Sequence, residues 1–317
     1  MLIKPDKLQH WLNHFYGYGS WQAPLWFVAY EESGGETPEE VAEKLNYFTE
    51  VHPQVGPTLC EIRKVYRSIA IRWDGPKASQ FKTRYEYRFG ENAVKHGLWK
   101  NLIAFAHAYR DEPLEDPLAY QRESFAIDRE ALLRLYPLPV AHHAWYYSWL
   151  DLPEKFAFLK NKALYQEHLY EQRIDTILHN IDTYHPRVVL MYGMENINGL
   201  KASVQKHFPD VTFKMFKAVK QHIPQHHYAE LNGTKLIITT QLPALRHNRI
   251  ETGFDWAAFG ETMRIGDRCG FCSTFRPNRT RNFRESSIGN REWGGTVSAY
   301  VLHRTGGVVE KSAVSGE

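Results

Sequence analysis

The sequence predicts an α/β fold, specifically a three-layer α/β/α sandwich around a mainly parallel central sheet. Short apolar runs alternate with longer stretches of helical periodicity; the runs are Leu25–Tyr30, Arg187–Gly193 and Lys235–Thr240. Such runs are typical of strands that are buried on both faces of a parallel sheet. Strands that alternate with helices favour a sheet with helices packed on both sides.

The first elements are a helix over residues 6–16, which ends at the glycine loop 17–20, and the strand 25–30. Residues 31–35 form a polar turn that contains two glycines. The next helix begins with Thr37 as N-cap, with a proline at its first position and Glu40 completing a capping box. The chain therefore opens with a strand, a tight turn and a helix.

Further helices are expected at 91–109, 162–183, 197–207 and 254–263. Between the first two, the segment 132–139 carries two prolines, which favour an extended backbone. Asn232-Gly233 lies between two strand-like runs and predicts a β-hairpin, whose second arm is the third apolar strand.

The apolar pattern stops near residue 264, so we predict an α/β domain over 1–263 and a basic, flexible tail over 264–317. Residues 264–291 hold seven arginines and only two acidic residues, whereas the whole chain has a net charge of +3. Because guanidinium groups bind phosphates, this segment suits a nucleic acid. A solvated tail without a partner is the alternative.

Several protein classes are disfavoured. No apolar run approaches about 18 residues and no secretory signal follows the first residues, so we expect a cytoplasmic protein with no membrane partner. Three cysteines are too few for a disulfide framework or a four-thiolate cluster. The pair Cys269 and Cys272 would need His247 or His303 to hold zinc, and we predict no metal. Motifs for P-loop, dinucleotide, zincin and α/β-hydrolase chemistry are missing from the sequence.

In open α/β sheets, ligands bind beyond the carboxyl ends of the strands. Those ends present Tyr30–Glu32, Tyr136–Pro139 and the segment 241–249. Glu31 and Glu32 are adjacent carboxylates that can act on a water as general base. The alternative is that one of them caps the turn or pairs with a lysine.

The segment 241–249 contains Arg246, His247 and Arg249, which can bind phosphates. An ordinary exposed basic loop is the alternative reading of these residues.

Four segments, in this order, resemble the uracil-DNA glycosylase superfamily. They are Phe27–Gly35, similar to the first motif; Tyr136–Pro139, at the base-reading strand end; Val188–Gly193, like the third core strand; and Ile237–Ala244, similar to the second motif. The likeness spans roughly residues 20–263, and no single motif is a strict match. It implies a uracil-DNA glycosylase-like fold and hydrolysis of an N-glycosidic bond in DNA, with no cofactor. We also expect a monomer.

The resemblance also implies roles for individual residues. Glu31 is the first candidate for activating water and Glu32 the second. Gln241 stands where many members have a histidine that stabilises the departing base, and His247 is a candidate substitute. The implied base pocket comprises Tyr30, Ser33, Gly34, Gly35, Tyr136, Leu138 and Pro139, and the implied DNA contacts are Arg246, Asn248 and Arg249.

The expected substrate is not ordinary uracil, because residues 136–139 lack the asparagine that would read it. The small turn 33–35 is expected to leave room for a larger base. Some bacterial members of the superfamily act in phage defence on hypermodified cytosines, so the resemblance favours a base such as glucosylated hydroxymethylcytosine in phage DNA. A non-catalytic DNA-binding member of the same fold, or a hydrolase of nucleosides or small glycosides, are the alternatives.

Overall fold

The computed structural model describes residues 2–32, 34–35, 37–72, 75–140, 145–219, 222–244 and 253–265. Backbone contacts divide the chain into two units, Met1–Phe271 and Cys272–Glu317, and every described residue belongs to the first. The last described helix, α9 (Trp256–Ile265), continues past residue 263, the predicted end of the domain. The remainder of the predicted tail lies outside the described residues.

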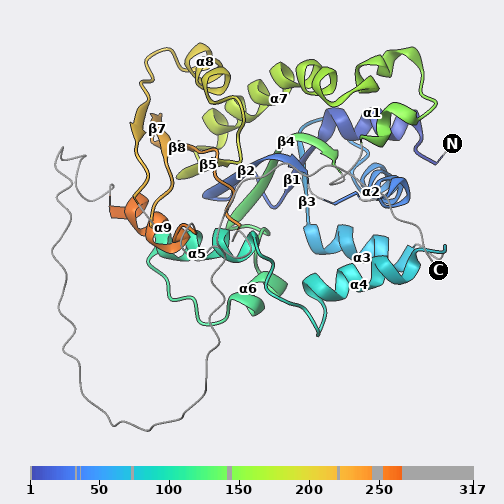
Figure 1. The fold of residues 1–317 in the computed structure, drawn as a ribbon, viewed down its shortest axis with the longest axis horizontal. Helices are drawn as coiled ribbons and strands as arrows, with labels where there is room; N and C mark the ends of the chain where they lie inside the picture. Colours follow the sequence, from blue (N-terminus) through green and yellow to red (C-terminus); the bar gives the residue numbers. More distant parts are fainter. Residues whose placement is uncertain are drawn as a thin grey trace, which may run out of the picture. The chain divides into compact units, whose positions relative to one another are not determined.

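One mostly parallel sheet organises the described part of the chain, with eight strands in the order β3-β1-β4-β2-β5-β8-β7-β6 (Figure 1). Its centre consists of β4 (Glu130–Pro139), β2 (Leu25–Glu32), β5 (Val188–Tyr192) and β8 (Thr234–Ile238), all parallel to one another. Each of the three predicted apolar runs forms one of these strands. The predicted α/β class with a mainly parallel sheet is confirmed.

Shorter strands extend the sheet on both sides. β1 (Phe15–Tyr18) lies between β4, to which it is antiparallel, and β3 (Thr58–Cys60). On the other side, β7 (His226–Leu231) forms the predicted hairpin with β8, and β6 (Lys214–Phe216) pairs with β7. Asn232 and Gly233 have φ values of 49° and 90°, as a tight two-residue hairpin requires.

The helix predicted over 6–16 begins one residue earlier and ends two residues earlier than expected, because α1 (Pro5–His14) gives way to β1 at Phe15. Gly17 explains why a glycine-rich segment can be a strand here. It has φ +137°, and a Cβ on it would lie 2.0 Å from the carbonyl oxygen of Leu132. Only glycine therefore allows β1 to approach β4 so closely.

Helices lie on both sides of the sheet: α7 and α8 on one side, and α3, α4, α5, α6 and α9 on the other (Figure 1). The helices predicted at 162–183 and 197–207 are confirmed, whereas the one predicted over 91–109 begins only at Trp99. The bounds of the helices not yet given are α2 (Pro38–Val51), α3 (Ile62–Arg72), α4 (Ala78–Phe89), α5 (Trp99–Arg110), α6 (Pro117–Glu123), α7 (Lys162–Tyr184) and α8 (Ile197–His207), with 3₁₀ helices η1 (Tyr146–Trp149) and η2 (Glu154–Lys160).

The start of α2 has the predicted N-cap and proline, whereas the Glu40 carboxylate, which was expected to complete a capping box, forms ion pairs with Lys44 and Arg84. The Thr37 side chain accepts a hydrogen bond from the Glu40 backbone N–H at 3.2 Å, and a proline occupies the first helical position. This cap fixes where the turn after β2 ends.

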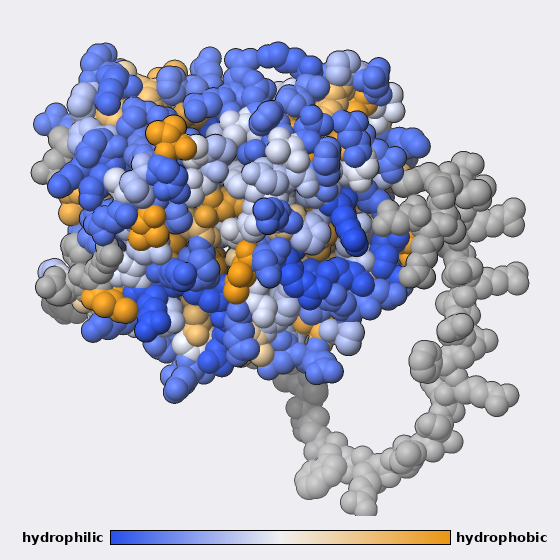
Figure 2. Space-filling model, turned by 180° about the vertical axis from the view of Figure 1, so that it is seen from behind, coloured by the Kyte–Doolittle hydropathy of each residue, from blue (hydrophilic) through white to orange (hydrophobic). Residues whose placement is uncertain are grey.

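The core runs along the central strands, where Trp26, Phe27 and Val28 of β2 are fully buried. From behind, the surface is mainly hydrophilic with small, separate hydrophobic patches (Figure 2). No helix in the described ranges combines the length and apolar character that crossing a membrane requires.

Candidate active site

The carboxyl ends of three neighbouring parallel strands meet at one edge of the sheet. Glu31 of β2 pairs with Tyr136 of β4, and Ala29 pairs with Tyr192 at the end of β5. A cavity of about 270 Å³ opens at this edge. It is lined by Tyr30, Leu135, Tyr136, Gln166, Glu167, Tyr170, Asn196 and Leu200.

Glu31 lies beside this cavity and is held by the first turns of α7. The Lys162 ammonium lies 2.7 Å from Glu31 Oε1 and donates to Oε2 at 2.9 Å. Gln166 Nε2 donates to Oε1 at 2.9 Å. Lys162 and Gln166 are four residues apart and therefore project from the same helix face. The Glu31 side chain keeps 20 % of its surface exposed, so its carboxylate can be reached from solvent.

Glu32 has a different environment. The pairing of β2 with β4 shifts between Glu31 and Glu32, and the two side chains have different partners. The Glu32 side chain is 1 % exposed; it accepts hydrogen bonds from Tyr18 Oη at 2.7 Å and Arg134 Nε at 2.5 Å, and Lys44 Nζ lies 3.7 Å away. Of the two candidate glutamates, Glu31 thus has an accessible carboxylate, whereas the Glu32 carboxylate is buried in ion pairs.

Two tyrosines form the wall next to Glu31. The rings of Tyr30 and Tyr136 meet edge to face, with centroids 5.1 Å apart, and their hydroxyls are hydrogen-bonded. Burial, followed by the charges of Glu195 and Glu31, raises the pKa of Tyr30 to about 12. Tyr30 therefore stays protonated at neutral pH, and its hydroxyl also interacts with Glu195 through a hydrogen bond.

Of the three predicted base-pocket residues in β4, only Tyr136 borders the cavity. Leu138 is fully buried, and its backbone N–H donates to Tyr165 Oη at 2.9 Å. Pro139 is buried as well, and its carbonyl accepts from Tyr147 Oη at 2.8 Å. The end of β4 therefore has its polar backbone groups engaged inside the protein.

The glycine turn after β2 is packed rather than open. Gly34 and Gly35 have φ values of +87° and +68°. A Cβ on Gly35 would lie 2.4 Å from Pro139 Cβ and 3.1 Å from Val41 Cγ2. The space that we expected at this turn is thus filled at Gly35, while Ser33 lies outside the described residues.

Gln241 is placed at the exit of β8, beside the end of β5. Its backbone N–H donates to Thr239 Oγ1 at 3.1 Å, and its carbonyl accepts from the Gly193 N–H at 3.1 Å. Gly193 follows Tyr192 directly, so Gln241 lies at the same edge of the sheet as Tyr30. Arg246, His247, Asn248 and Arg249 lie outside the described residues.

Sequence reasoning missed Lys162, Gln166, Glu195 and Tyr170. Glu195 could have been found, because it closely follows the apolar strand that we used to locate other strand ends. Lys162 and Gln166 carried no comparable signal, since polar residues at the start of a helix normally face solvent. Tyr170 is one turn further along the same helix face as Gln166.

The cysteines and possible metal ligands offer no second reactive site among the described residues. Cys60 is buried and burial raises the pKa of its thiol, while Cys269 and Cys272 lie outside the described residues. Among the described residues, no group of three His, Cys, Asp or Glu side chains is arranged to hold a metal ion.

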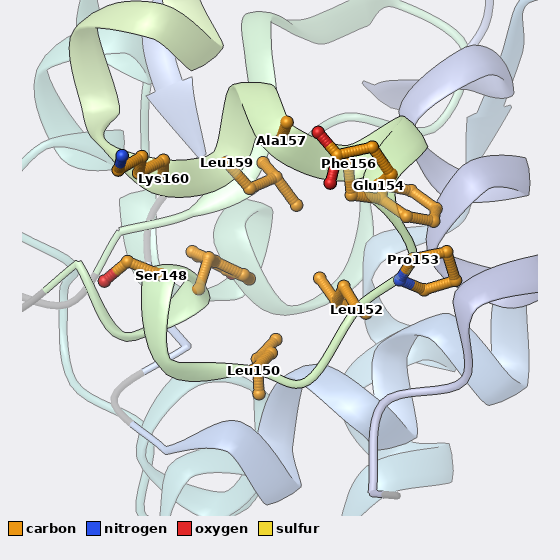
Figure 3. A pocket seen from close by; sticks show the side chains of 10 residues that line it. Ser148, Leu150, Leu152, Pro153, Glu154, Phe156, Ala157, Leu159 and Lys160 are labelled. Atoms are coloured by element: carbon orange, nitrogen blue, oxygen red, sulfur yellow. The ribbon is translucent and has the colours of Figure 1, made fainter.

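A second cavity of about 310 Å³, beside η1 and η2, is lined mainly by apolar side chains such as Leu150, Leu152 and Leu159 (Figure 3).

The chain matches no family model, no curated protein and no solved structure.

Proposed function

We propose that the protein is a DNA glycosylase with the α/β/α fold of the uracil-DNA glycosylase superfamily. One observation carries the proposal: Glu31, held by Lys162 and Gln166, lies beside a tyrosine-walled cavity at the carboxyl edge of a parallel sheet. A positioned carboxylate next to aromatic faces suits hydrolysis at a sugar that carries a flat base.

The order of the four central strands supports this fold. Each of the four segments that resemble the superfamily's motifs includes the carboxyl end of one central strand. These strands, β2, β4, β5 and β8, are parallel neighbours in the order β4-β2-β5-β8. Their carboxyl ends therefore lie along one edge. Such an edge is where open α/β sheets bind ligands.

In the proposed reaction, a water held by Glu31 attacks C1′ of the target deoxyribose. The C1′–N bond breaks, its electron pair leaves with the base, and the water's proton passes to Glu31. The negative carboxylate also favours the oxocarbenium character of the transition state. Tyr30, Tyr136 and Tyr170 line the cavity and offer aromatic surface to the flipped base, which offsets the few kcal/mol that flipping costs.

We propose a modified cytosine, such as glucosylated hydroxymethylcytosine in phage DNA, as the base that is released. Uracil recognition requires hydrogen-bonding groups aimed at its Watson–Crick edge, and the end of β4 offers few. The carbonyls of Pro137 and Pro139 and the N–H of Leu138 already have partners within the protein. A base that lacks matching partners in a desolvated pocket is strongly disfavoured.

The test is to incubate the purified protein with DNAs that carry uracil, cytosine, hydroxymethylcytosine or glucosylated hydroxymethylcytosine, followed by alkaline cleavage. We expect strand breaks at the modified cytosine, and mass spectrometry should identify the free base. Glu31→Gln serves as the inactive control. If none of these DNAs gives abasic sites, the glycosylase proposal is wrong.

A second candidate is a hydrolase of free nucleosides, favoured by the cavity volume of about 270 Å³ and by the presence of both Glu31 and Glu195 near Tyr30. Adding free modified nucleosides to the same assay separates the two candidates. Release of base from nucleosides but not from DNA would favour this second function.

A further inference from the structure

The helical hairpin formed by α3 and α4 is the most basic part of the described chain. Residues 62–89 include eight lysines and arginines but only two acidic residues, whereas the net charge of the whole protein is +3. This concentration of charge is separate from the arginine-rich tail and from the loop 246–249.

Some of these cations have a structural role. Arg63 donates to the backbone carbonyls of Gln121, Arg122 and Phe125, and so fixes α3 to the end of α6. Arg88 lies over the ring of Trp99, 5.1 Å from its centroid. These side chains are used in packing and need no partner outside the protein.

Three other cations do not have such partners. The side chains of Lys64, Arg67 and Lys82 are exposed and make no ion pair or hydrogen bond with any described residue. Lys64 and Arg67 are three residues apart and lie on one face of α3. Like charges on one face repel each other, and a polyanion would relieve that repulsion.

A groove runs between the two helices at this position. It has a volume of about 480 Å³ and is lined by Arg67, Ala70, Ile71, Lys82, Tyr85 and Glu86. Arg67 and Lys82 belong to different helices, so the groove has a cation on each wall. Glu86 is its one acidic lining residue, and Ile71 keeps 68 % of its surface exposed.

The hairpin is anchored to the turn that follows Glu31. Arg84 of α4 forms an ion pair with Glu40, and Lys77, just before α4, pairs with Glu39 at 3.2 Å. Glu39 and Glu40 form the first turn of α2. The position that a Cβ would take on Gly34 is 3.1 Å from Glu40 Oε1. The hairpin is thus tied to the start of α2, the helix that follows β2 and the glycine turn.

We propose that the α3–α4 hairpin binds the phosphate backbone of duplex DNA through Lys64, Arg67 and Lys82. This inference rests on the proposed function, because it assumes that the substrate is DNA. Contacts of this kind position a protein on the duplex without reading its sequence. They supply affinity that falls steeply with salt concentration.

The test compares two triple variants of the full-length protein. Lys64→Gln, Arg67→Gln and Lys82→Gln together should lower the slope of log K against log salt by about 2 to 3, since each phosphate contact contributes about 0.9. The control combines Lys201→Gln, Lys206→Gln and Lys217→Gln, which removes the same charge on and near α8 and β6, towards the other end of the sheet. Binding is measured by fluorescence anisotropy with an unmodified 20-mer duplex.

The results separate this inference from the glycosylase proposal, because binding is measured on DNA that contains no substrate base. A lower slope in the hairpin variant alone supports the inference, even if no base is ever released. Equal loss in both variants, or an unchanged slope in the hairpin variant, overturns it. A hairpin variant that loses its helical circular dichroism is replaced by the single changes Arg67→Gln and Lys82→Gln, each expected to lower the slope by about 1.

Discussion

Lys162 Nζ lies 2.7 Å from Glu31 Oε1, and this ion pair joins the first turn of α7 to the carboxyl end of β2. Both side chains are partly exposed, at 38 % and 20 %, so the pair contributes little to stability, about 0–1 kcal/mol. Its main effect is on geometry, because together with Gln166 it fixes the orientation of the Glu31 carboxylate at this edge of the sheet.

Glu31→Gln should abolish base release while DNA binding is kept. Glutamine retains the size of the side chain but loses the charge that takes a proton from water, a role worth about 10²–10⁴-fold. Single-turnover cleavage and anisotropy measure the two properties separately. Glu195→Gln is the comparison, since it removes the other carboxylate near Tyr30. Full activity in Glu31→Gln would mean that the water is activated elsewhere.

Lys162→Met should lower kcat about 10-fold and leave KM nearly unchanged. The reason is that a misplaced carboxylate slows the chemical step through poor alignment, whereas the binding of substrate is not weakened. Lys162→Arg should restore part of the activity, because a guanidinium can still donate to Glu31. Lys160→Met removes a neighbouring exposed lysine and is the control. If Lys162→Met raised KM alone, Lys162 would be a DNA contact instead.

The rule that ligands bind at the carboxyl ends of parallel strands was sufficient to place Glu31 at the end of a central strand from the sequence. It could not separate Glu31 from Glu32, because the two are adjacent and chemically identical. What distinguishes them is the surroundings of Glu32, which the cations Arg134 and Lys44 enclose. Those partners lie far away in the sequence, so no local pattern shows them.

The same limit applies to other elements. The β7–β8 hairpin and the cap at Thr37 were predictable because a few neighbouring residues determine them. β1 was missed, because its position depends on the close approach that Gly17 makes to Leu132. The space around Gly35 was also misjudged, since Pro139 fills it from another strand.

Glu32→Gln should reduce the free energy of unfolding by about 3–5 kcal/mol, because it removes the carboxylate that is paired with the buried Arg134, while Lys44 keeps its ion pair with Glu40. Urea denaturation followed by circular dichroism measures the loss. Glu171→Gln is the matched control: it breaks the exposed pair with Lys206 and should leave the free energy of unfolding nearly unchanged. Equal stability of the two variants would show that Glu32 is not a structural anchor.

His96 should make the protein less stable in mild acid. Burial first, and then the charges of Arg88 and Arg134, lower the pKa of His96 to about 3, and its Nδ1 accepts a hydrogen bond from the Trp99 N–H at the start of α5. The unfolded chain takes up this proton near pH 6.5, so between about pH 6.5 and 3 the unfolded state binds more protons. Stability contributed by the neutral ring is therefore complete above pH 6.5 and is lost as the pH falls towards 3.

The slope in that window is at most about 1.4 kcal/mol per pH unit for one proton. His96→Asn keeps a side-chain acceptor for the start of α5 but cannot be protonated, so its unfolding free energy should fall less steeply between pH 6.5 and 4. Urea denaturation at a series of pH values measures both slopes. His207→Asn, a change on the last turn of α8, is the control and should keep the wild-type slope. If the His96 variant also keeps the wild-type slope, then His96 is already protonated in the folded protein, and the hydrogen bond from Trp99 cannot be what begins α5.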